Sequence, residues 1–212
     1  MRVGARYGIL GGTFDPPHFG HLALAQEAAA RLRLDRVWFM PAADPPHKQG
    51  RALAPAADRA AMVSLAIADN ERFGLDRTDL DRPGPSYTVD TLAILRARWG
   101  LDAWLGFIIG WDMLRYFPQW RDPEGVLAQL DALIVAQRPG AAHDDDEIAQ
   151  LEAETPTLRA KLTPLDAPQL DIASTALRER AAAGLPLRYL TPDSVCAYIS
   201  RRSLYRHDTR KS

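Results

Sequence analysis

Short apolar runs alternate along the chain with longer segments whose apolar residues recur at helical spacing. The apolar runs predict buried strands at residues 7–10, 36–40, 104–109 and 132–136. The other segments predict helices at residues 22–34, 56–68, 88–98, 174–183 and 192–201. Strands separated by helices indicate crossover connections. We therefore expect an α/β fold, with a doubly wound, mostly parallel sheet and helices on both faces.

The length of 212 residues fits one domain with a sizeable core. We expect residues 1–212 to form this single domain, with the helical part at about 174–205 packed on the same sheet. No apolar run approaches the roughly 20 residues that span a bilayer, and the first residues lack the apolar segment of a secretory signal. These features predict a cytoplasmic protein without a membrane partner.

Charge and cysteine content exclude several kinds of site. The 26 Lys and Arg residues balance 27 Asp and Glu residues, so no overall basic charge favours a nucleic-acid partner. The single cysteine, Cys196, excludes an intramolecular disulfide and a cysteine-rich zinc site. The acidic run at residues 144–147 is typical of a solvated helix start.

The segment after the first predicted strand reads Gly-Gly-Thr-Phe-Asp-Pro-Pro-His-Phe-Gly-His over residues 11–21. Ligands of parallel sheets bind beyond the carboxyl ends of the strands. The glycines allow backbone amides to approach a ligand, and His18 and His21 lie on one face of a helix start that favours anions. A phosphate site and a tight turn with two surface histidines are the alternatives. A zinc site is disfavoured, because two histidines and Asp15 are too few ligands.

The whole string closely resembles the nucleotidyltransferase signature, in which His-x-Gly-His follows a first strand and a Gly-rich turn. Its longer form is similar to bacterial nicotinate-nucleotide adenylyltransferases in particular. The resemblance implies a Rossmann-like fold and transfer of the adenylyl group of ATP to nicotinate mononucleotide, which gives deamido-NAD and pyrophosphate. It implies that ATP is bound by Gly11, Gly12, Thr13, Phe14, His18 and His21.

Two further segments extend the resemblance on the phosphate side. Pro-Pro-His-Lys follows the second predicted strand, where prolines fix the loop and Lys48 can reach a phosphate of either substrate. The alternative is a surface lysine. Asp112 ends a Gly-Trp-Asp segment and by resemblance lies near the ATP ribose or its metal-bound phosphates. Its alternative is a helix cap.

Two other segments resemble the part of the family that binds the mononucleotide. In Ser-Tyr-Thr, the resemblance assigns Thr88 to the nicotinate carboxylate, while Ser86 or Thr88 also suits a helix N-cap. In Phe-Pro-Gln-Trp, it assigns Trp120 to stacking on the pyridine ring. Arg121 stands where some relatives have Tyr, and its guanidinium can add affinity for the carboxylate.

The segment at residues 172–178 resembles the second family signature, Ile-Ser-x-Thr-x-x-Arg. Ala173 replaces the usual serine, whereas Ser174, Thr175 and Arg178 are placed at a helix start that suits the ATP phosphates. The expected catalytic set is His18, His21, Lys48 and Arg178, so the two ends of the chain must fold together.

The expected partners are ATP and nicotinate mononucleotide, and a homodimer is possible. Mg²⁺ is expected with ATP, without a dedicated protein metal site. Another transferase of the superfamily, or a nucleotide-binding sensor without catalysis, is the rival interpretation.

Overall fold

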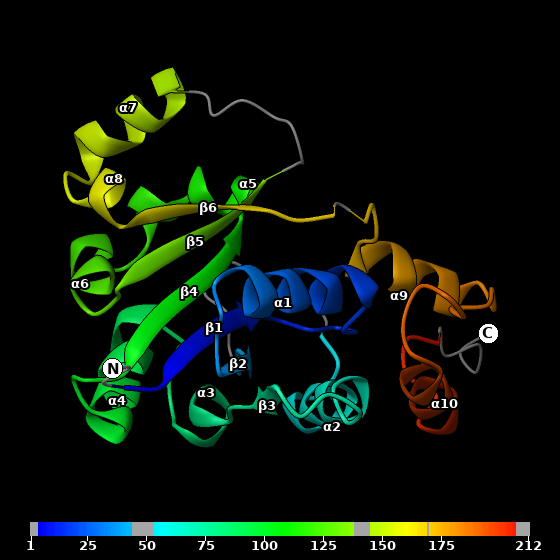
Figure 1. The fold of residues 1–212 in the computed structure, drawn as a ribbon. Coiled ribbons are helices and arrows are strands. Elements are labelled where there is room, and N and C mark those ends of the chain that lie inside the picture. The colour runs from blue at the N-terminus through cyan, green and yellow to red at the C-terminus, as the bar shows by residue number, and fades with distance from the viewer. Residues whose placement is uncertain (1–3, 44–52, 138–144, 169, 207–212) are drawn as a thin grey trace.

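The computed structural model describes residues 4–43, 53–137, 145–168 and 170–206. Within these residues, the strands form one sheet in the order β3-β2-β1-β4-β5-β6 (Figure 1). Every pairing in the sheet is parallel. The strands are β1 Arg6–Gly12, β2 Arg36–Pro41, β3 Phe73–Leu75, β4 Trp104–Gly110, β5 Ala132–Gln137 and β6 Leu162–Asp166.

All four predicted strands are confirmed, and the two edge strands are the ones that the apolar pattern missed. β3 has only three residues, so it offers no periodicity to recognise. β6 carries Pro164 in its interior, which an edge strand tolerates because one side of its backbone needs no partner. The doubly wound parallel sheet is therefore confirmed, with two more strands than expected.

The predicted helices are confirmed, with ends that differ by up to three residues. They are α1 Phe19–Arg31, α2 Ala56–Ala66, α4 Thr88–Trp99, α9 Ser174–Ala182 and α10 Asp193–Arg201. Shorter elements fill the connections: α3 Thr78–Asp81, α5 Trp111–Leu114, the 3-10 helix η2 Phe117–Gln119, α6 Pro123–Ala128, α7 Asp145–Glu154 and α8 Leu158–Lys161. None of the helices in the described ranges is long and apolar enough to cross a membrane.

Neighbouring residues of each central strand point to opposite faces of the sheet and belong to two separate cores. On β1, Ile9 packs in the cluster that contains Leu92 and Leu95 of α4. The next residue, Leu10, packs in the cluster that contains Ala25 of α1. Helices therefore bury both faces, which explains why the strands read as continuous apolar runs.

The C-terminal helices belong to the same core as the start of the chain. Leu177 of α9 and Val195 and Ile199 of α10 join the cluster that contains Leu10. Figure 1 shows α9 and α10 beside α1 and α2, beyond the end of the sheet. This docking brings the last part of the chain next to the loop that follows β1.

Candidate active site

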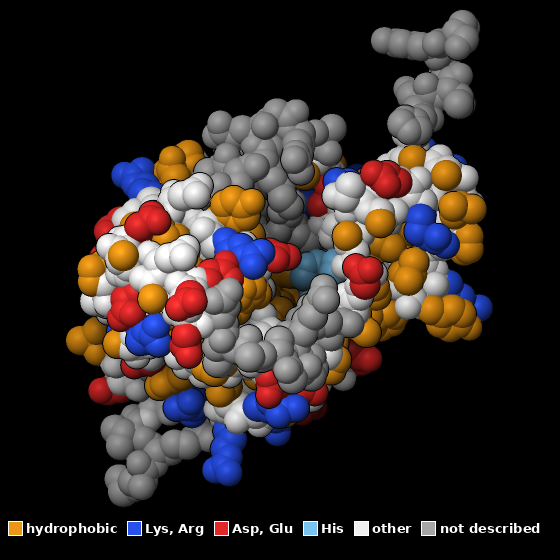
Figure 2. Space-filling view, turned by 90° about the horizontal axis from the view of Figure 1, so that it is seen from above, with side chains coloured by type: hydrophobic (Ala, Val, Ile, Leu, Met, Phe, Trp, Pro, Cys, Tyr) orange, Lys and Arg blue, Asp and Glu red, His pale blue; other side chains and the backbone are white. Residues whose placement is uncertain are grey.

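The candidate site lies where the order of the strands reverses. β1 is flanked by β2 on one side and β4 on the other, so connections leave the middle of the sheet toward opposite faces. Ligands of doubly wound sheets bind in the crevice that this reversal opens at the carboxyl ends of the strands. Figure 2 shows histidine surface in a hollow between two parts of the molecule, and His18 and His21 are the histidines in the described ranges.

The two histidines form a stacked pair at the start of α1. His18 is the N-cap and His21 lies in the first turn. Their ring centroids are 3.7 Å apart, with an angle of 29° between the planes. The backbone N–H of His18 donates to Nδ1 of His21 at 3.2 Å. In the neutral His21 ring, Nε2 therefore carries the proton and can donate to an anion.

His18 is buried at the base of this pair, with only 7% of its surface exposed. Its Nδ1 has no hydrogen-bond partner in the described part of the chain. Burial lowers the pKa of His18 from 6.5 to about 4, so the ring is neutral at pH 7. A Cβ at Gly20 would lie 3.0 Å from this Nδ1, so glycine makes room for the ring.

Because His18 is buried as a neutral ring, protein stability is expected to fall as the pH drops from 6.5 to 4. In that window the unfolded chain binds a proton that the folded chain does not. The loss from this group should reach about 2–3 kcal/mol near pH 4 and then level off. Urea unfolding of the wild type and of His18→Asn between pH 4 and 7 measures it. The difference in unfolding free energy between them should change with pH, and a constant difference would contradict the prediction.

The two glycines at the end of β1 have a structural role in addition to any contact with a ligand. A Cβ at Gly11 would lie 2.9 Å from the Phe107 ring, and one at Gly12 would lie 3.1 Å from the Phe14 ring. The Phe14 ring in turn meets His21 edge-on, with centroids 5.0 Å apart. The absence of side chains on these glycines thus lets aromatic rings support the histidine pair.

The second signature meets the first loop from the other end of the chain. Nη1 of Arg178 donates to the backbone carbonyl of Asp15 at 2.9 Å. The hydroxyl of Ser174 donates to the carbonyl of Pro16 at 2.9 Å. The expected meeting of the two chain ends is therefore confirmed. The single hydroxyl proton of Ser174 is used in this contact, so Ser174 attaches α9 to the loop.

Arg178 remains at the surface of the site although it is held on two sides. Its Nη2 donates to Oγ1 of Thr175 at 3.1 Å. About a quarter of its side chain, 24%, is exposed. The guanidinium is thus oriented by the loop and by its own helix, and it can still reach a ligand.

Arg59 of α2 is a site residue that the sequence analysis did not identify. Its side chain is 1% exposed and donates to four backbone carbonyls at 2.6–3.1 Å. These carbonyls belong to Thr13, Ala42, Ala43 and Ala54. Arg59 therefore connects the loops that follow β1 and β2. The sequence did offer one sign that Arg59 is buried. It lies three residues before Met62, on the apolar face of the helix.

The residues assigned to the nicotinate ring lie together on the other side of the crevice. Trp120 follows η2 and packs edge-on against Phe107, with centroids 6.0 Å apart. The guanidinium of Arg121 lies 4.6 Å above the ring of Tyr87, the residue before Thr88. The structure thus brings the Trp-Arg segment against the Ser-Tyr-Thr segment.

The expected capping role of Ser86 or Thr88 is wrong. Tyr87 is the N-cap of α4, and among the described residues no side chain forms a capping hydrogen bond there. Oγ of Ser86 instead accepts the backbone N–H of Ala43 at 3.1 Å. Ser86 therefore attaches the start of α4 to the loop after β2, which leaves the first amides of α4 without a side-chain cap.

The remaining expectations concern Asp112, Lys48 and a metal site. Asp112 lies in the first turn of α5 with its side chain 95% exposed, 4.0 Å from Arg115. Lys48 lies outside the described residues. In the described ranges, no group of three or more His, Cys, Asp or Glu side chains could hold a metal ion.

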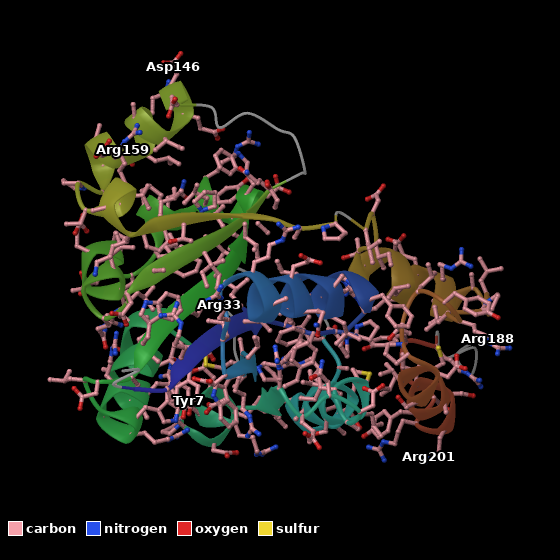
Figure 3. All side chains as sticks on the ribbon, viewed as in Figure 1. Tyr7, Arg33, Asp146, Arg159, Arg188 and Arg201 are labelled. Carbon is pink, nitrogen blue, oxygen red and sulfur yellow. The ribbon has the colours of Figure 1, made fainter. Side chains whose placement is uncertain are left out.

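The described part of the acidic run, Asp145–Glu147, begins a helix, as expected, but one member is not solvated. Figure 3 labels Asp146 on α7, on the opposite side of the molecule from α9 and α10. Glu147 accepts hydrogen bonds from the side chains of Trp111 and Arg115, and only 20% of it is exposed. The solvated interpretation is therefore wrong for Glu147, which attaches α7 to α5.

Comparisons with known proteins agree with this arrangement. The Cytidylyltransferase-like family model matches residues 9–180. A probable nicotinate-nucleotide adenylyltransferase from Roseiflexus sp. (strain RS-1) is 48% identical over 202 residues, which cover 95% of this chain and 98% of that protein. One from Symbiobacterium thermophilum is also 48% identical and covers 95% of each chain.

The fold also matches solved structures. Plasmodium falciparum nicotinic acid mononucleotide adenylyltransferase complexed with NaAD has a TM-score of 0.74 at 18% identity, covering 95% of this chain and 97% of that chain. The same enzyme complexed with APC has a TM-score of 0.72 with the same identity and coverage. At this identity the structural match concerns the fold, whereas the family model and the relatives at 48% identity concern the family. The chain belongs to the cytidylyltransferase-like family and, within it, to the nicotinate-nucleotide adenylyltransferases.

Proposed function

We propose that this protein transfers the adenylyl group of ATP to nicotinate mononucleotide, forming deamido-NAD and releasing pyrophosphate. The observation that carries the proposal is the contact between the loop that leads into the stacked histidines and Arg178. The contact joins segments 163 residues apart at the carboxyl edge of the sheet. Donors and a cation around one loop suit a triphosphate.

In the proposed reaction, a phosphate oxygen of the mononucleotide attacks the α-phosphorus of ATP in line. The bond from the α-phosphorus to the oxygen bridging to the β-phosphorus breaks, and pyrophosphate leaves with that electron pair. No covalent enzyme intermediate is needed, so positioning and charge stabilisation supply the catalysis. His18 as a neutral donor, His21 through Nε2 and Arg178 as a cation would stabilise the charge that develops on the phosphates.

Other residues would complete the ATP site. Thr13 and Phe14, with the amides of Gly11 and Gly12, would border the nucleotide, and Thr175 would orient Arg178. Lys48 would bracket the phosphates from the loop after β2, and Asp112 would lie near the ribose. Because the described residues hold no cluster suited to a metal, we propose that Mg²⁺ arrives as part of the ATP complex, held by phosphate oxygens and water.

The nicotinate ring would bind between the Ser-Tyr-Thr and Trp-Arg segments. Trp120 offers an aromatic face that is supported edge-on by Phe107. The uncapped amides at Thr88 and the guanidinium of Arg121 offer donors and positive charge for the carboxylate. A carboxamide would accept fewer of these hydrogen bonds and carry no charge. The geometry therefore favours nicotinate over nicotinamide mononucleotide.

Pyrophosphate release with ATP and a set of mononucleotides tests this function. Nicotinate mononucleotide is expected to exceed nicotinamide mononucleotide in kcat/KM by about 10–100-fold, the value of one or two charge-assisted hydrogen bonds. Arg121→Gln should reduce this difference in kcat/KM between the two mononucleotides. Equal efficiency toward the two would contradict the carboxylate site. ATP binding without release of pyrophosphate from ATP, whichever mononucleotide is added, would favour the rival nucleotide sensor.

A further inference from the structure

The carboxylate of Asp15 is buried beneath the first loop and faces groups from both ends of the chain. Only 1% of the residue is exposed. Oδ1 accepts the hydroxyl of Tyr205 at 2.7 Å and the backbone N–H of Ala54 at 3.3 Å. Oδ2 has no hydrogen-bond partner in the described part of the chain, and it lies 3.8 Å from Nη1 of Arg178. Oδ1 is thus held by two hydrogen bonds, whereas Oδ2 lies near the guanidinium of Arg178.

Tyr205 reaches this carboxylate from beyond the end of α10. Its backbone has φ of 64°, a left-handed conformation that non-glycine residues seldom adopt. Burial, and then the hydrogen bond to Asp15, raise the pKa of the Tyr205 hydroxyl far above its ordinary value. The hydroxyl therefore keeps its proton and remains a donor at neutral pH.

Arg178 forms a hydrogen bond with the backbone of Asp15, and with its carboxylate it forms only a longer ion pair. Nη1 donates to the carbonyl oxygen at 2.9 Å, whereas 3.8 Å to Oδ2 is too long for a hydrogen bond. A hydrogen-bonded pair between guanidinium and carboxylate, in which both partners are charged, would be stronger than a contact in which only one partner is charged. Something must therefore keep the carboxylate from turning toward Arg178, and the Tyr205 hydroxyl is the shortest contact that holds it.

We propose that Tyr205 is a positioning residue, whose hydroxyl holds the Asp15 carboxylate so that Arg178 stays available to the ATP phosphates. The inference rests on the proposed function, because it assigns a purpose to the orientation of Arg178. Without the hydroxyl, the Asp15 carboxylate turns toward the guanidinium of Arg178, which already lies 3.8 Å from Oδ2. The ion pair between Arg178 and Asp15 must then be broken before Arg178 can bind the ATP phosphates.

A second tyrosine provides a matched control. The Tyr198 hydroxyl also donates to a buried carboxylate, that of Asp58, at 2.7 Å. Asp58 also accepts a hydrogen bond from Arg202, just beyond α10, at 3.0 Å. Tyr198→Phe therefore removes the same kind of hydrogen bond from the same end of the chain, but it leaves Arg178 unaffected.

Two measurements test this role. Calorimetry gives the Kd of ATP and of inorganic pyrophosphate, and a pyrophosphate-release assay gives kcat and the KM of each substrate. Tyr205→Phe is expected to raise both Kd values about tenfold, the value of one charge-assisted hydrogen bond, with KM for the mononucleotide unchanged. Tyr198→Phe should leave them at wild-type values. Asp15→Asn in the Tyr205→Phe protein should restore pyrophosphate binding, because the neutral amide no longer attracts the guanidinium.

Other results would contradict either the positioning role of Tyr205 or the phosphate-binding role of Arg178. If Tyr205→Phe binds pyrophosphate as the wild type does, or if Asp15→Asn fails to restore binding, the positioning role is wrong. ATP binding in Arg178→Ala tests the proposed function separately from the role of Tyr205. Arg188→Ala is the control for this variant. Arg188 lies at the outer end of the C-terminal helices with its side chain 64% exposed (Figure 3). Unchanged ATP binding in Arg178→Ala would overturn the phosphate site itself.

Discussion

Replacing His21 by Ala is expected to lower kcat by about 10²–10³-fold, the usual effect of losing one donor to a developing charge. The backbone N–H of His18 already occupies Nδ1, so Nε2 is the donor that the substitution removes from the site. The stacked His18 ring would also lose the neighbour 3.7 Å away that holds its orientation. Pyrophosphate release at saturating ATP and nicotinate mononucleotide measures the change.

Two further substitutions at the same position separate the donor from the fold. His21→Asn places a side-chain oxygen where Nδ1 accepts the N–H of His18, but it has no group at the position of Nε2. His21→Gln places an amide N–H near that position. We expect the Asn variant to be folded and as slow as Ala, and the Gln variant to regain part of the rate. Near-normal turnover in the Ala or Asn variant would refute the role of Nε2.

The central sheet was predictable because its physical cause is visible in the sequence. Strands buried on both faces must be apolar on both faces, so β1, β4 and β5 appear as unbroken apolar runs. The edge strands need no such run. β3 is too short, and β6 contains a proline that only an edge tolerates. The pattern therefore predicts the layers of the fold better than the width of the sheet.

Groups with local spacing were also predictable. His18 and His21 are the N-cap and the third residue of α1, so the spacing placed both rings at one helix start, where they stack. Ser86 and Ser174 were interpreted through their own helices, but their hydroxyls bind backbone groups of other segments. A hydroxyl beside a helix start gives the same sequence signal in both cases, and only the fold decides which partner it meets.

Some of the long-range contacts that support the site left no signal in the sequence. The partners of Arg59 are carbonyl oxygens, which every residue type carries, so no sequence pattern identifies them. Tyr205 and Asp15 are 190 residues apart and likewise lack a local spacing. The histidines and Arg178 are therefore recognisable in the sequence, whereas the residues that hold their loops in place appear only in three dimensions.

Because Arg59 holds two loops together, we expect Arg59→Met to be among the most destabilising substitutions in the protein. Four backbone carbonyl oxygens after β1 and β2 would lose the buried donor that they share, and methionine offers none in return. The expected loss of unfolding free energy is about 3–5 kcal/mol, the range for breaking a buried network of a charged group. Urea unfolding followed by circular dichroism measures it.

Arg59→Lys and Arg31→Met make this measurement specific. Lysine keeps the charge but has three donors instead of five and cannot span carbonyls in a plane, so it should recover only part of the loss. Arg31 is 57% exposed and pairs with Glu27 on the surface of α1, so its replacement should change stability little. If Arg59→Met unfolds at the same urea concentration as Arg31→Met, the carbonyl contacts do not hold these loops.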